Sequence, residues 1–332
     1  MATTPTLSDV HVNRPLTKMA ALFMTDLQDF QADYLAPIMP SDKRSNTYYK
    51  LDKNYWFSDI MQKRGPGVAA VRKGWGTLMD SFLIDVWAVG KDIDDQTRAN
   101  ADDELQLEAT SMKFVARAER LNREKRFYDA VWNAAAWSNS LTGNTALSAI
   151  SAGTAGTINQ WNDANSTPIN DVQSIQTVSR LTTGMAFTDL AIGQEVFNAL
   201  KSNTQILDRI TGGSTSVNPA NVTKELISNL LGINLVVLSA VENTAGLGNA
   251  MTGQYIFGKQ GLFMHRDNSP GMETPTAIRT ITWQQYAGNK NGTRIMKWRD
   301  ESIHSDIIEM ESAYVHKIVA PDLGLFVNGL VA

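Results

Sequence analysis

Residues 97–136 read TRANADDELQLEATSMKFVARAERLNREKRFYDAVWNAAA, and they carry the strongest helix pattern of the chain. Neither Gly nor Pro interrupts residues 98–141, and acidic side chains near the start precede a basic stretch, an order that suits the helix dipole. At about 1.5 Å per residue, such a helix would span roughly 50 Å or more, which is longer than an ordinary globular helix. One helical face is apolar, and we expect it to be buried: Leu107, Phe114, Ala118, Leu121, Tyr128 and Trp132.

Residues 47–93, directly before this helix, predict a long β-hairpin. The first arm owes its strand propensity to aromatic residues, namely Tyr48, Tyr49, Tyr55, Trp56 and Phe57. The second arm is apolar and partly alternating, with Leu78, Phe82, Ile84, Val86, Ala88 and Val89. The link at residues 60–77 contains Gly65-Pro66-Gly67 and Gly74, so it is too long for a tight turn and too polar at its centre for a core. Four basic residues lie in this link: Lys63, Arg64, Arg72 and Lys73.

Three of the eight tryptophans, Trp56, Trp75 and Trp87, fall within the predicted hairpin. Large aromatic residues on an appendage often anchor contacts with a partner. Packing within the hairpin itself would explain them equally well, so both interpretations stay open.

Residues 1–46 are the least regular part of the sequence, with prolines at positions 5, 15, 37 and 40. The first fifteen residues show no periodicity, whereas residues 16–34 have apolar residues at helical spacing. Residues 1–16 carry too few large apolar groups for a core, yet they would reach about 50 Å when extended. We expect an arm that orders on a neighbouring subunit, the alternative being a frayed terminus. No basic region precedes an apolar stretch, so we expect no signal peptide.

Shorter patterns follow the long helix. Residues 138–170 are rich in Ser, Thr, Gly, Asn and Ala and predict a long ordered loop, followed by a helix at 170–181. Residues 185–275 alternate strand and helix patterns, which is typical of a compact α/β domain. Residues 278–286 and 293–299 predict strands that flank an Asn-Gly turn, and residues 308–318 predict a half-buried strand that ends before Pro321.

Composition restricts the function classes. Hydrophobic residues make up 43% and charged residues 19% of the 332 residues, so the chain can bury a core and is not intrinsically disordered. The net charge of −4 argues against a dedicated nucleic-acid binder, and the absence of cysteine excludes disulfides and thiol chemistry. No run approaches 18 apolar residues, so we expect a soluble protein without a transmembrane helix.

A search for catalytic patterns finds none. The four histidines, His11, His265, His304 and His316, do not stand at metal-ligand spacing. Phosphate loops and the Gly-x-Ser-x-Gly elbow are absent from the sequence. The acidic pair Asp94-Asp95 lies at a helix entrance, where capping explains it. We therefore predict no catalytic residue, no metal and no cofactor.

The order of the predicted elements resembles that of the major capsid proteins of tailed double-stranded DNA phages, the Hong Kong ninety-seven type. An arm comes first, then a long hairpin with a basic Gly-Pro-Gly tip, a very long helix, an α/β domain and returning strands. The local sequence is also similar to that family. YLAPIMP at 34–40, YY at 48–49 and RGPG at 64–67 resemble the entry to its E-loop, and residues 302–321 resemble its closing strand.

The resemblance implies an α+β phage major capsid fold in six parts. These are the N-terminal arm (1–46), the E-loop hairpin (47–93), the spine helix and P-domain (94–184), the A-domain (185–275), the returning strands of the P-domain and A-domain (276–320) and the C-terminal segment (321–332). It implies a non-enzymatic protein that forms hexamers and pentamers in an icosahedral shell. That shell would enclose double-stranded DNA without sequence-specific binding and without a membrane. Scaffolding, portal and decoration proteins would be the partners. The protein would be assembled in the host cytoplasm and reside in the virion capsid.

Nine residues are candidates for intersubunit contact: Lys63, Arg64, Arg72, Lys73, Trp56, Trp75, Asn289, Lys290 and Asn291. We expect the four basic residues of the hairpin link to meet an acidic surface of the adjacent subunit. Some capsid relatives crosslink a lysine to an asparagine of a neighbouring subunit, and Lys63, Lys73 and Asn289 or Asn291 lie in suitable regions.

Two other functions stay open. One is the shell protein of an encapsulin nanocompartment, which shares the capsid fold. The other is a hydrolase or transferase built on the α/β domain, although the sequence offers no set of nucleophile, base and orienting residue for it.

Overall fold

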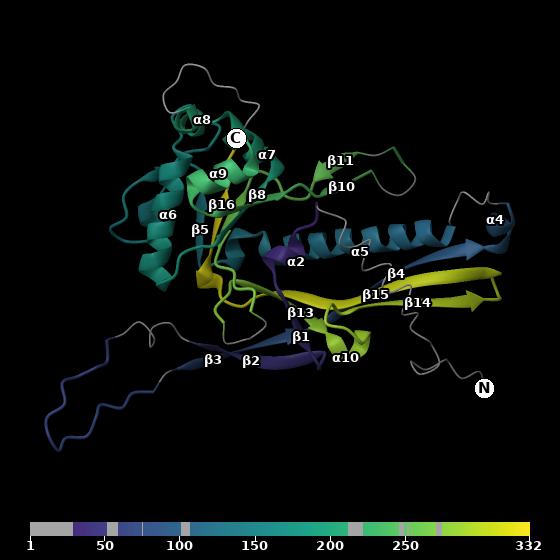
Figure 1. Ribbon diagram of the computed structural model, residues 1–332, viewed down its shortest axis with the longest axis horizontal. Coiled ribbons are helices and arrows are strands. Elements are labelled where there is room, and N and C mark those ends of the chain that lie inside the picture. The colour runs from purple at the N-terminus through teal and green to yellow at the C-terminus, as the bar shows by residue number, and fades with distance from the viewer. Residues whose placement is uncertain are drawn as a thin grey trace.

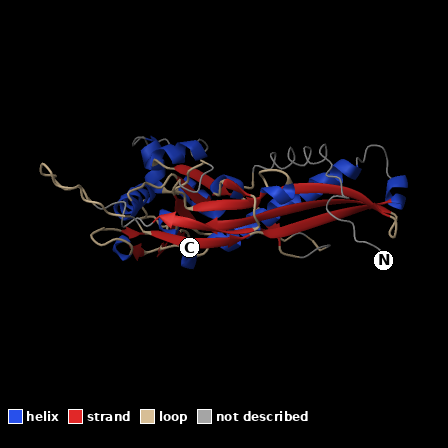
Figure 2. Cartoon of the chain, turned by 90° about the horizontal axis from the view of Figure 1, so that it is seen from below, coloured by secondary structure: helices blue, strands red, loops and turns tan. Residues whose placement is uncertain are grey.

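A computed structural model of the chain describes residues 29–51, 59–74, 76–100, 107–211, 222–245, 249–250, 252–269 and 274–332. The predicted arm at residues 1–16, most of the predicted helix at 16–34, and both Trp56 and Trp75 lie outside the described residues. The described chain is elongated, with a long sheet and a long helix side by side (Figure 1). A compact sheet covered by helices lies at one end of them, and a loop projects beyond it (Figures 1 and 2).

The long sheet has the strand order β1-β13-β15-β14, and β4 pairs with the opposite edge of β15. Its strands are β1 (Ile38–Ser41), β4 (Asp85–Asp94), β13 (Ile278–Trp283), β14 (Thr293–Asp300) and β15 (Ser305–Ile318). β15 is central, because its residue Met310 pairs with Val89 of β4 on one side and with Ile295 of β14 on the other. The two strands that flank the predicted Asn-Gly turn, β13 and β14, both pair with β15, and α10 (Gln284–Ala287) lies between them in sequence.

The predicted long helix is α5 (Leu107–Val131), which packs along the long sheet and follows the short α4 (Asp95–Ala99). Its predicted buried face is wrong at Phe114, which is 54% exposed, whereas the next residue, Val115, is 1% exposed. The buried side of α5 is made of Met112, Val115, Ala116, Glu119, Arg123, Glu124, Phe127 and Val131. Three of these residues are charged, so apolar periodicity alone misplaces the buried face.

The projecting hairpin consists of β2 (Ser45–Leu51) and β3 (Thr77–Leu83), which pair antiparallel. The predicted hairpin of residues 47–93 is therefore too long at its second arm. At Ile84 the chain leaves the hairpin, where the Ile84 N–H donates to the Arg44 carbonyl over 2.9 Å, and β4 then joins β15.

Leaving the hairpin also changes which side chains face the core. The predicted alternation of Ile84, Val86 and Ala88 is wrong after Ile84, because Val86 and Ala88 are exposed. Trp87 instead lies toward α5, with the Arg126 guanidinium 4.8 Å from its ring centroid.

The compact sheet has the strand order β5-β16-β12-β8-β9. Its strands are β5 (Asn139–Thr142), β8 (Asp189–Gly193), β9 (Asn234–Leu238), β12 (Gly261–Met264) and β16 (Gly324–Asn328). The accompanying helices are α6 (Pro168–Thr183), α7 (Gln194–Ser202), α8 (Thr204–Thr211) and α9 (Lys224–Leu231). The strand and helix alternation predicted for residues 185–275 is confirmed by these elements.

The two faces of the compact sheet pack on different partners. Leu190 and Ile192 of β8 point into a core shared with the four helices, whereas Ala191 between them points into a core shared with the end of α5. This alternation follows from the two-residue period of a strand. The second core thus joins the compact sheet to the long sheet.

Short elements complete the chain. The predicted loop at 138–170 holds β6 (Thr145–Ala146), η2 (Leu147–Ala149) and β7 (Thr157–Ile158), and η1 (Ala134–Ala136) precedes it. β10 (Val241–Asn243) and β11 (Gly253–Tyr255) form a second small hairpin, and η4 (Pro321–Leu323) follows β15. Within the described ranges, no helix is long and apolar enough to cross a membrane.

Candidate intersubunit surfaces and a buried ionic cluster

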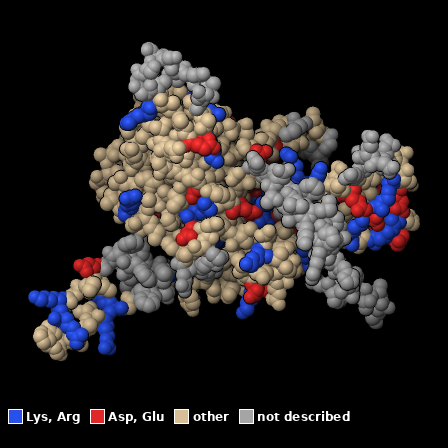
Figure 3. Space-filling view, in the orientation of Figure 1, with Lys and Arg blue, Asp and Glu red and all other residues tan. Residues whose placement is uncertain are grey.

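Residues 59–74, which we call the basic loop, extend from the β2–β3 hairpin away from the rest of the chain (Figure 1). Lys63, Arg64, Arg72 and Lys73 are all exposed, and Asp59 is the one acidic residue of this segment. Figure 3 shows these cations at the end of the projection. The loop turns at Gly67, whose φ of +79° favours glycine. The four basic residues that lie close together in the sequence therefore also lie together on one exposed, positively charged loop.

Apolar side chains are concentrated on the same appendage. Of the fifteen large apolar side chains exposed in the described part of the chain, eight lie between positions 49 and 83. Met61 is 89% exposed, and the cross-strand partners Tyr49 and Met79 are 64% and 68% exposed. Most of the apolar surface of this pair is therefore in contact with water, and covering it would be favourable.

The opposite face of the hairpin is anchored to the long sheet. Tyr48 and Phe82 are buried in a small core with Ile281 of β13. The carboxylate of Asp80 accepts hydrogen bonds from Tyr48 (3.0 Å) and from Lys317 of β15 (3.3 Å). Burial alone would raise the pKa of Asp80, but hydrogen bonds from Lys50 and from its other neighbours hold that pKa well below its usual range. The hairpin is thus fixed at its base, with one face packed and one face bare.

The far end of the long sheet carries a charged surface of the opposite sign. We define this acidic tip as residues 91–98, Glu108 and residues 297–306. Ion pairs link its parts, including Arg98 to Asp306 (2.7 Å) and Lys297 to Glu108 (2.7 Å). Figure 3 shows the mixed red and blue surface at that end. Seven acidic side chains stand against four basic ones: Asp92, Asp94, Asp95, Glu108, Asp300, Glu301 and Asp306 against Lys91, Arg98, Lys297 and Arg299.

The predicted contact residues at 289–291 lie in the connection between α10 and β14. Asn289 uses its side chain within its own loop, accepting from the Thr293 N–H (3.3 Å) and donating to the Thr293 carbonyl. The Lys290 carbonyl accepts from Thr282 (2.7 Å), and the Asn291 carbonyl accepts from Arg123 (3.4 Å). The side chains of Lys290 and Asn291 are exposed. In Figure 1 the basic loop lies well apart from α10, the helix that precedes these residues in the chain.

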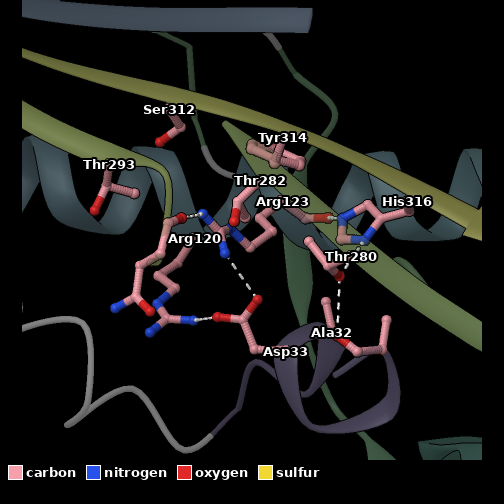
Figure 4. Close-up of polar contacts among 12 residues, drawn as sticks. Ala32, Asp33, Arg120, Arg123, Thr280, Thr282, Thr293, Ser312, Tyr314 and His316 are labelled. Atoms are coloured by element: carbon pink, nitrogen blue, oxygen red, sulfur yellow. Dashed lines mark hydrogen bonds and ion pairs between the residues drawn. The ribbon is translucent and has the colours of Figure 1, made fainter. Parts of the chain in front are cut away.

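A buried ionic cluster that the sequence analysis missed lies beneath this loop (Figure 4). Its centre is Arg123, whose guanidinium is 2.9 Å from both Asp33 and Glu119 and 4.6 Å from the Tyr314 ring centroid. Arg120 also pairs with Asp33. Burial raises the pKa of Asp33, but the charges of Arg123 and Arg120 outweigh it and leave that pKa well below its usual range.

Two further titratable groups of this cluster are buried without a counter-charge of their own. Glu124 accepts hydrogen bonds from the backbone N–H groups of Ala32 (2.9 Å) and Gln31 (3.3 Å), and burial raises its pKa to about 7. His316 lies with Nδ1 2.9 Å from Thr280 Oγ1 (Figure 4), and burial, together with the charge of Arg123, lowers its pKa to about 4. The sequence feature that could have indicated this cluster is the group of charged residues on the side of α5 that is buried. Apolar periodicity assigns charged residues to the solvent-exposed side of a helix, so it does not predict them in the core.

Few reactive side chains come together outside this cluster in the part of the chain that the structure describes. Within the ranges that the structure describes, no three His, Asp or Glu side chains come together in a way that could hold a metal ion. The shallow hollow lined by Asp42, Gln284, Gln285 and Gly288 brings no nucleophile and base together.

Comparison with known proteins finds similar structures but no match by sequence. No family model matches the chain, and no curated protein matches it. A phage-related protein from Bordetella bronchiseptica matches with a TM-score of 0.71 and 16% identity over 97% of this chain and 98% of that chain. The capsid of the cyanophage P-SCSP1u matches with a TM-score of 0.54 and 13% identity over 89% and 87%. A virus-like particle from Pyrococcus furiosus matches with a TM-score of 0.53 and 9% identity over 95% and 99%.

The fold is therefore one shared by proteins that build closed shells. More particularly, the chain has the α+β fold of phage capsid proteins, with matches that extend over most of both chains. The fold predicted from the order of the sequence elements is confirmed.

Proposed function

We propose that this protein is the major capsid protein of a tailed phage and that it assembles into the icosahedral shell around the double-stranded DNA genome. The single observation that carries this proposal is the β2–β3 appendage, on a phage capsid fold, with eight exposed large apolar side chains. A two-stranded hairpin is marginally stable in water by itself, and exposed apolar groups of this number gain free energy once a neighbour covers them.

The two charged ends suggest how neighbours meet. The basic loop has four cations and one anion, and the acidic tip has an excess of anions. We infer that the basic loop of one subunit lies on the acidic tip of the next, in a contact that repeats around a ring. Each exposed ion pair contributes only about 0–1 kcal/mol, so the contact depends on many copies acting together.

The other partners follow from the same proposal. The subunits would form hexamers and pentamers, with scaffolding, portal and decoration proteins attached during or after assembly in the host cytoplasm. The net charge of −4 favours a shell that encloses DNA without binding its sequence. The role is structural rather than catalytic. The six-part division into arm, hairpin, spine helix with P-domain, A-domain, returning strands and C-terminal segment belongs to this proposal as well.

Electron microscopy and light scattering of the purified protein test the proposal. We expect rings or closed particles, and a strictly monomeric protein across micromolar concentrations and salt conditions would refute it. Nucleic acid extracted from particles made during infection separates a phage capsid from the second candidate, a protein-filled compartment. A second candidate is retained because the chain is also similar in fold to a virus-like particle, that of Pyrococcus furiosus.

A charge exchange tests the contact separately from the function. Reversing Lys63, Arg64, Arg72 and Lys73 to Glu should prevent particle formation while leaving the circular dichroism of the subunit unchanged. Asp92→Lys with Glu301→Lys reverses part of the acidic tip at two exposed positions. Combining both sets should restore particles. Normal particles from the loop variant, or no rescue in the combination, would refute the contact while leaving the capsid function standing.

A further inference from the structure

β4 forms one edge of the long sheet along all ten of its residues. It pairs antiparallel with β15, and β14 pairs with the opposite side of β15. No strand in the described part of the chain pairs with the outer side of β4. An unpaired edge presents a row of backbone N–H and C=O groups to which a strand of another chain can add.

One hydrogen bond shows which residues of β4 direct their backbone groups outward. The Asp95 N–H donates to the His304 carbonyl over 3.2 Å, which continues the pairing of β4 with β15 by one residue. Backbone groups point to alternate sides along a strand, so the odd-numbered residues of β4 face β15. The N–H and C=O groups of Val86, Ala88 and Gly90 therefore point away from β15, and none of them has a hydrogen-bond partner among the described residues.

The outer edge of β4 lacks the features that normally prevent such pairing. Residues 86–90 include no charged residue and no proline, and the pairing with β15 continues without a bulge from Asp85 to Asp94. Gly90 is exposed, and a Cβ at this position would lie 3.8 Å from its nearest contact, the Ile308 carbonyl oxygen. The surface beside the edge is thus open. Charges, prolines and bulges are the usual protection of an exposed edge, so this edge is suited to accept a strand.

The charges of β4 indicate which strand fits. When two copies of β4 run antiparallel with Ala88 opposite Ala88, Asp85 of each copy lies opposite Lys91 of the other, because both lie three residues from Ala88. These pairs fall at the positions without mutual hydrogen bonds, where side chains approach most closely. Opposite charges there stabilise a sheet and like charges destabilise it. A register centred on Gly90 would instead place Asp85 opposite Asp95, which repel each other.

The uncharged residues of the register centred on Ala88 also fit. Trp87 lies opposite Val89, and an aromatic residue beside a β-branched one is a favourable cross-strand pair. Val86 lies opposite Gly90, so a larger side chain meets the smallest one. Ala88 lies on the axis that relates the two copies. The strand is therefore complementary to itself in charge and in size.

We propose that β4 pairs with β4 of a second copy of this chain, in an antiparallel contact centred on Ala88 that joins the long sheets of two subunits into one continuous sheet. Both copies use the same surface, so the contact closes on itself as a dimer. It differs in this respect from the contact of the basic loop with the acidic tip, which joins two different surfaces. The β4 contact needs only a second copy of the chain and does not rest on the formation of a shell.

Disulfide trapping of the purified full chain tests the register. The chain contains no cysteine, so Ala88→Cys introduces one thiol on the proposed axis, with its Cα about 5.5 Å from that of the second copy and within disulfide range. Val86→Cys is the matched control on the same edge and face, because its two thiols would lie four residues apart, at about 14 Å. On mild oxidation we expect covalent dimers from Ala88→Cys and few from Val86→Cys. Equal trapping of the two variants, or no covalent dimer from Ala88→Cys, would overturn the proposal.

A charge exchange in the Ala88→Cys protein tests the partner. Asp85→Lys or Lys91→Asp alone should slow trapping on the order of tenfold, because two pairs per dimer change from attraction to repulsion. The two changes together should restore the rate. Lys91 also lies 3.7 Å from Asp92 within the subunit, so urea unfolding of each variant separates an effect on the subunit from an effect on the contact. Unchanged trapping in the single variants, or slow trapping in the combination, would show that the strands do not meet in this register.

Ala88→Pro tests the outward direction of the backbone groups. Proline is tolerated in an edge strand where its nitrogen faces away from the sheet. The variant should therefore keep the circular dichroism and thermal unfolding of the parent and lose the dimer in sedimentation at raised protein concentration. Val89→Pro removes an N–H that faces β15, so this control should destabilise the subunit itself. An Ala88→Pro variant that dimerises like the parent, or one that fails to fold, would contradict the proposal.

Discussion

Arg123 Nη1 lies 2.9 Å from Asp33 Oδ1, and this ion pair joins α5 to the short helix α2 (Ala32–Leu35) across 90 residues of sequence. The same guanidinium pairs with Glu119, and its side chain is 2% exposed. Two carboxylates thus share one buried cation. Its removal would leave Glu119, whose side chain is 4% exposed, without a cation, and would leave Asp33 with Arg120 alone.

Arg123→Met is predicted to destabilise the subunit strongly. The variant leaves Asp33 with Arg120 alone and leaves Glu119 without its cation, and loss of one partner of a buried pair typically costs about 3–5 kcal/mol. Urea unfolding followed by circular dichroism measures this cost. Arg117→Met, at an exposed position of the same helix, is the control and should change the free energy of unfolding by less than about 0.5 kcal/mol. Equal unfolding of the two variants would show that the cluster does not support the fold.

Neighbouring residues of α5 should respond in opposite ways to the same substitution. Val115→Asp places a carboxylate in the core between α5 and the long sheet, where an unpaired charge typically costs several kcal/mol. Phe114→Asp acts at a side chain that is 54% exposed, so we expect a change within about 1 kcal/mol. Soluble yield and thermal unfolding, measured for both variants, test which of the two residues faces the core. Insoluble Phe114→Asp protein together with folded Val115→Asp protein would reverse the assignment of the buried face.

His316 is predicted to make the subunit sensitive to acid. Its pKa is lowered from 6.5 to about 4 in the folded state, so the unfolded chain binds this proton more readily. The stability that depends on neutral His316 is fully present above about pH 6.5 and is lost as the pH falls through about 4, by roughly 3 kcal/mol in all. His316→Gln should flatten the pH dependence of the free energy of unfolding in this window. An unchanged slope would mean that another group titrates there.

The bare face of the β2–β3 hairpin should matter for assembly and not for the subunit. Tyr49→Ser with Met79→Ser changes two exposed side chains, so we expect the unfolding free energy to stay within about 1 kcal/mol. Particle yield should fall, because each copy of the contact loses apolar area. Phe82→Ala, at a buried position of the same hairpin, should instead cost about 3–5 kcal/mol in the subunit itself. Particles of normal yield from the double variant would argue that this face stays uncovered.

Several elements could be predicted from local sequence because their signals are local. The long helix is marked by an uninterrupted run of helix-forming residues, and β15 is marked by apolar residues that alternate with Glu309, Glu311 and Lys317. The cations of the basic loop are set by the positions of Lys63, Arg64, Arg72 and Lys73 in a segment rich in glycine. The order of these elements was enough to indicate the fold.

The pairing of strands was not local. The chain from Tyr48 to Val89 reads as two arms of one hairpin, but only β3 pairs with β2, whereas β4 pairs with β15 over its whole length. That competition depends on residues more than 200 positions later, so the break at Ile84 cannot be read from the hairpin alone. The same holds for the side chains after Ile84, whose inward and outward faces are exchanged once the strand joins the other sheet.

The sequence by itself determined where the long helix and most strands lie, where the charges gather and which catalytic motifs are missing. It did not indicate α10, because residues 284–286 continue the strand pattern of β13. Only the tertiary structure decided which face of α5 is buried. A charge such as Glu119, Arg123 or Glu124 is tolerated in the interior when partners compensate it, and those partners, Asp33, Ser312 and the amides of Gln31 and Ala32, come from α2, its approach and β15. A prediction from apolar periodicity assumes that burying a charged side chain always costs free energy. In the folded protein that cost depends on contacts with distant segments, which the periodicity of one helix does not contain.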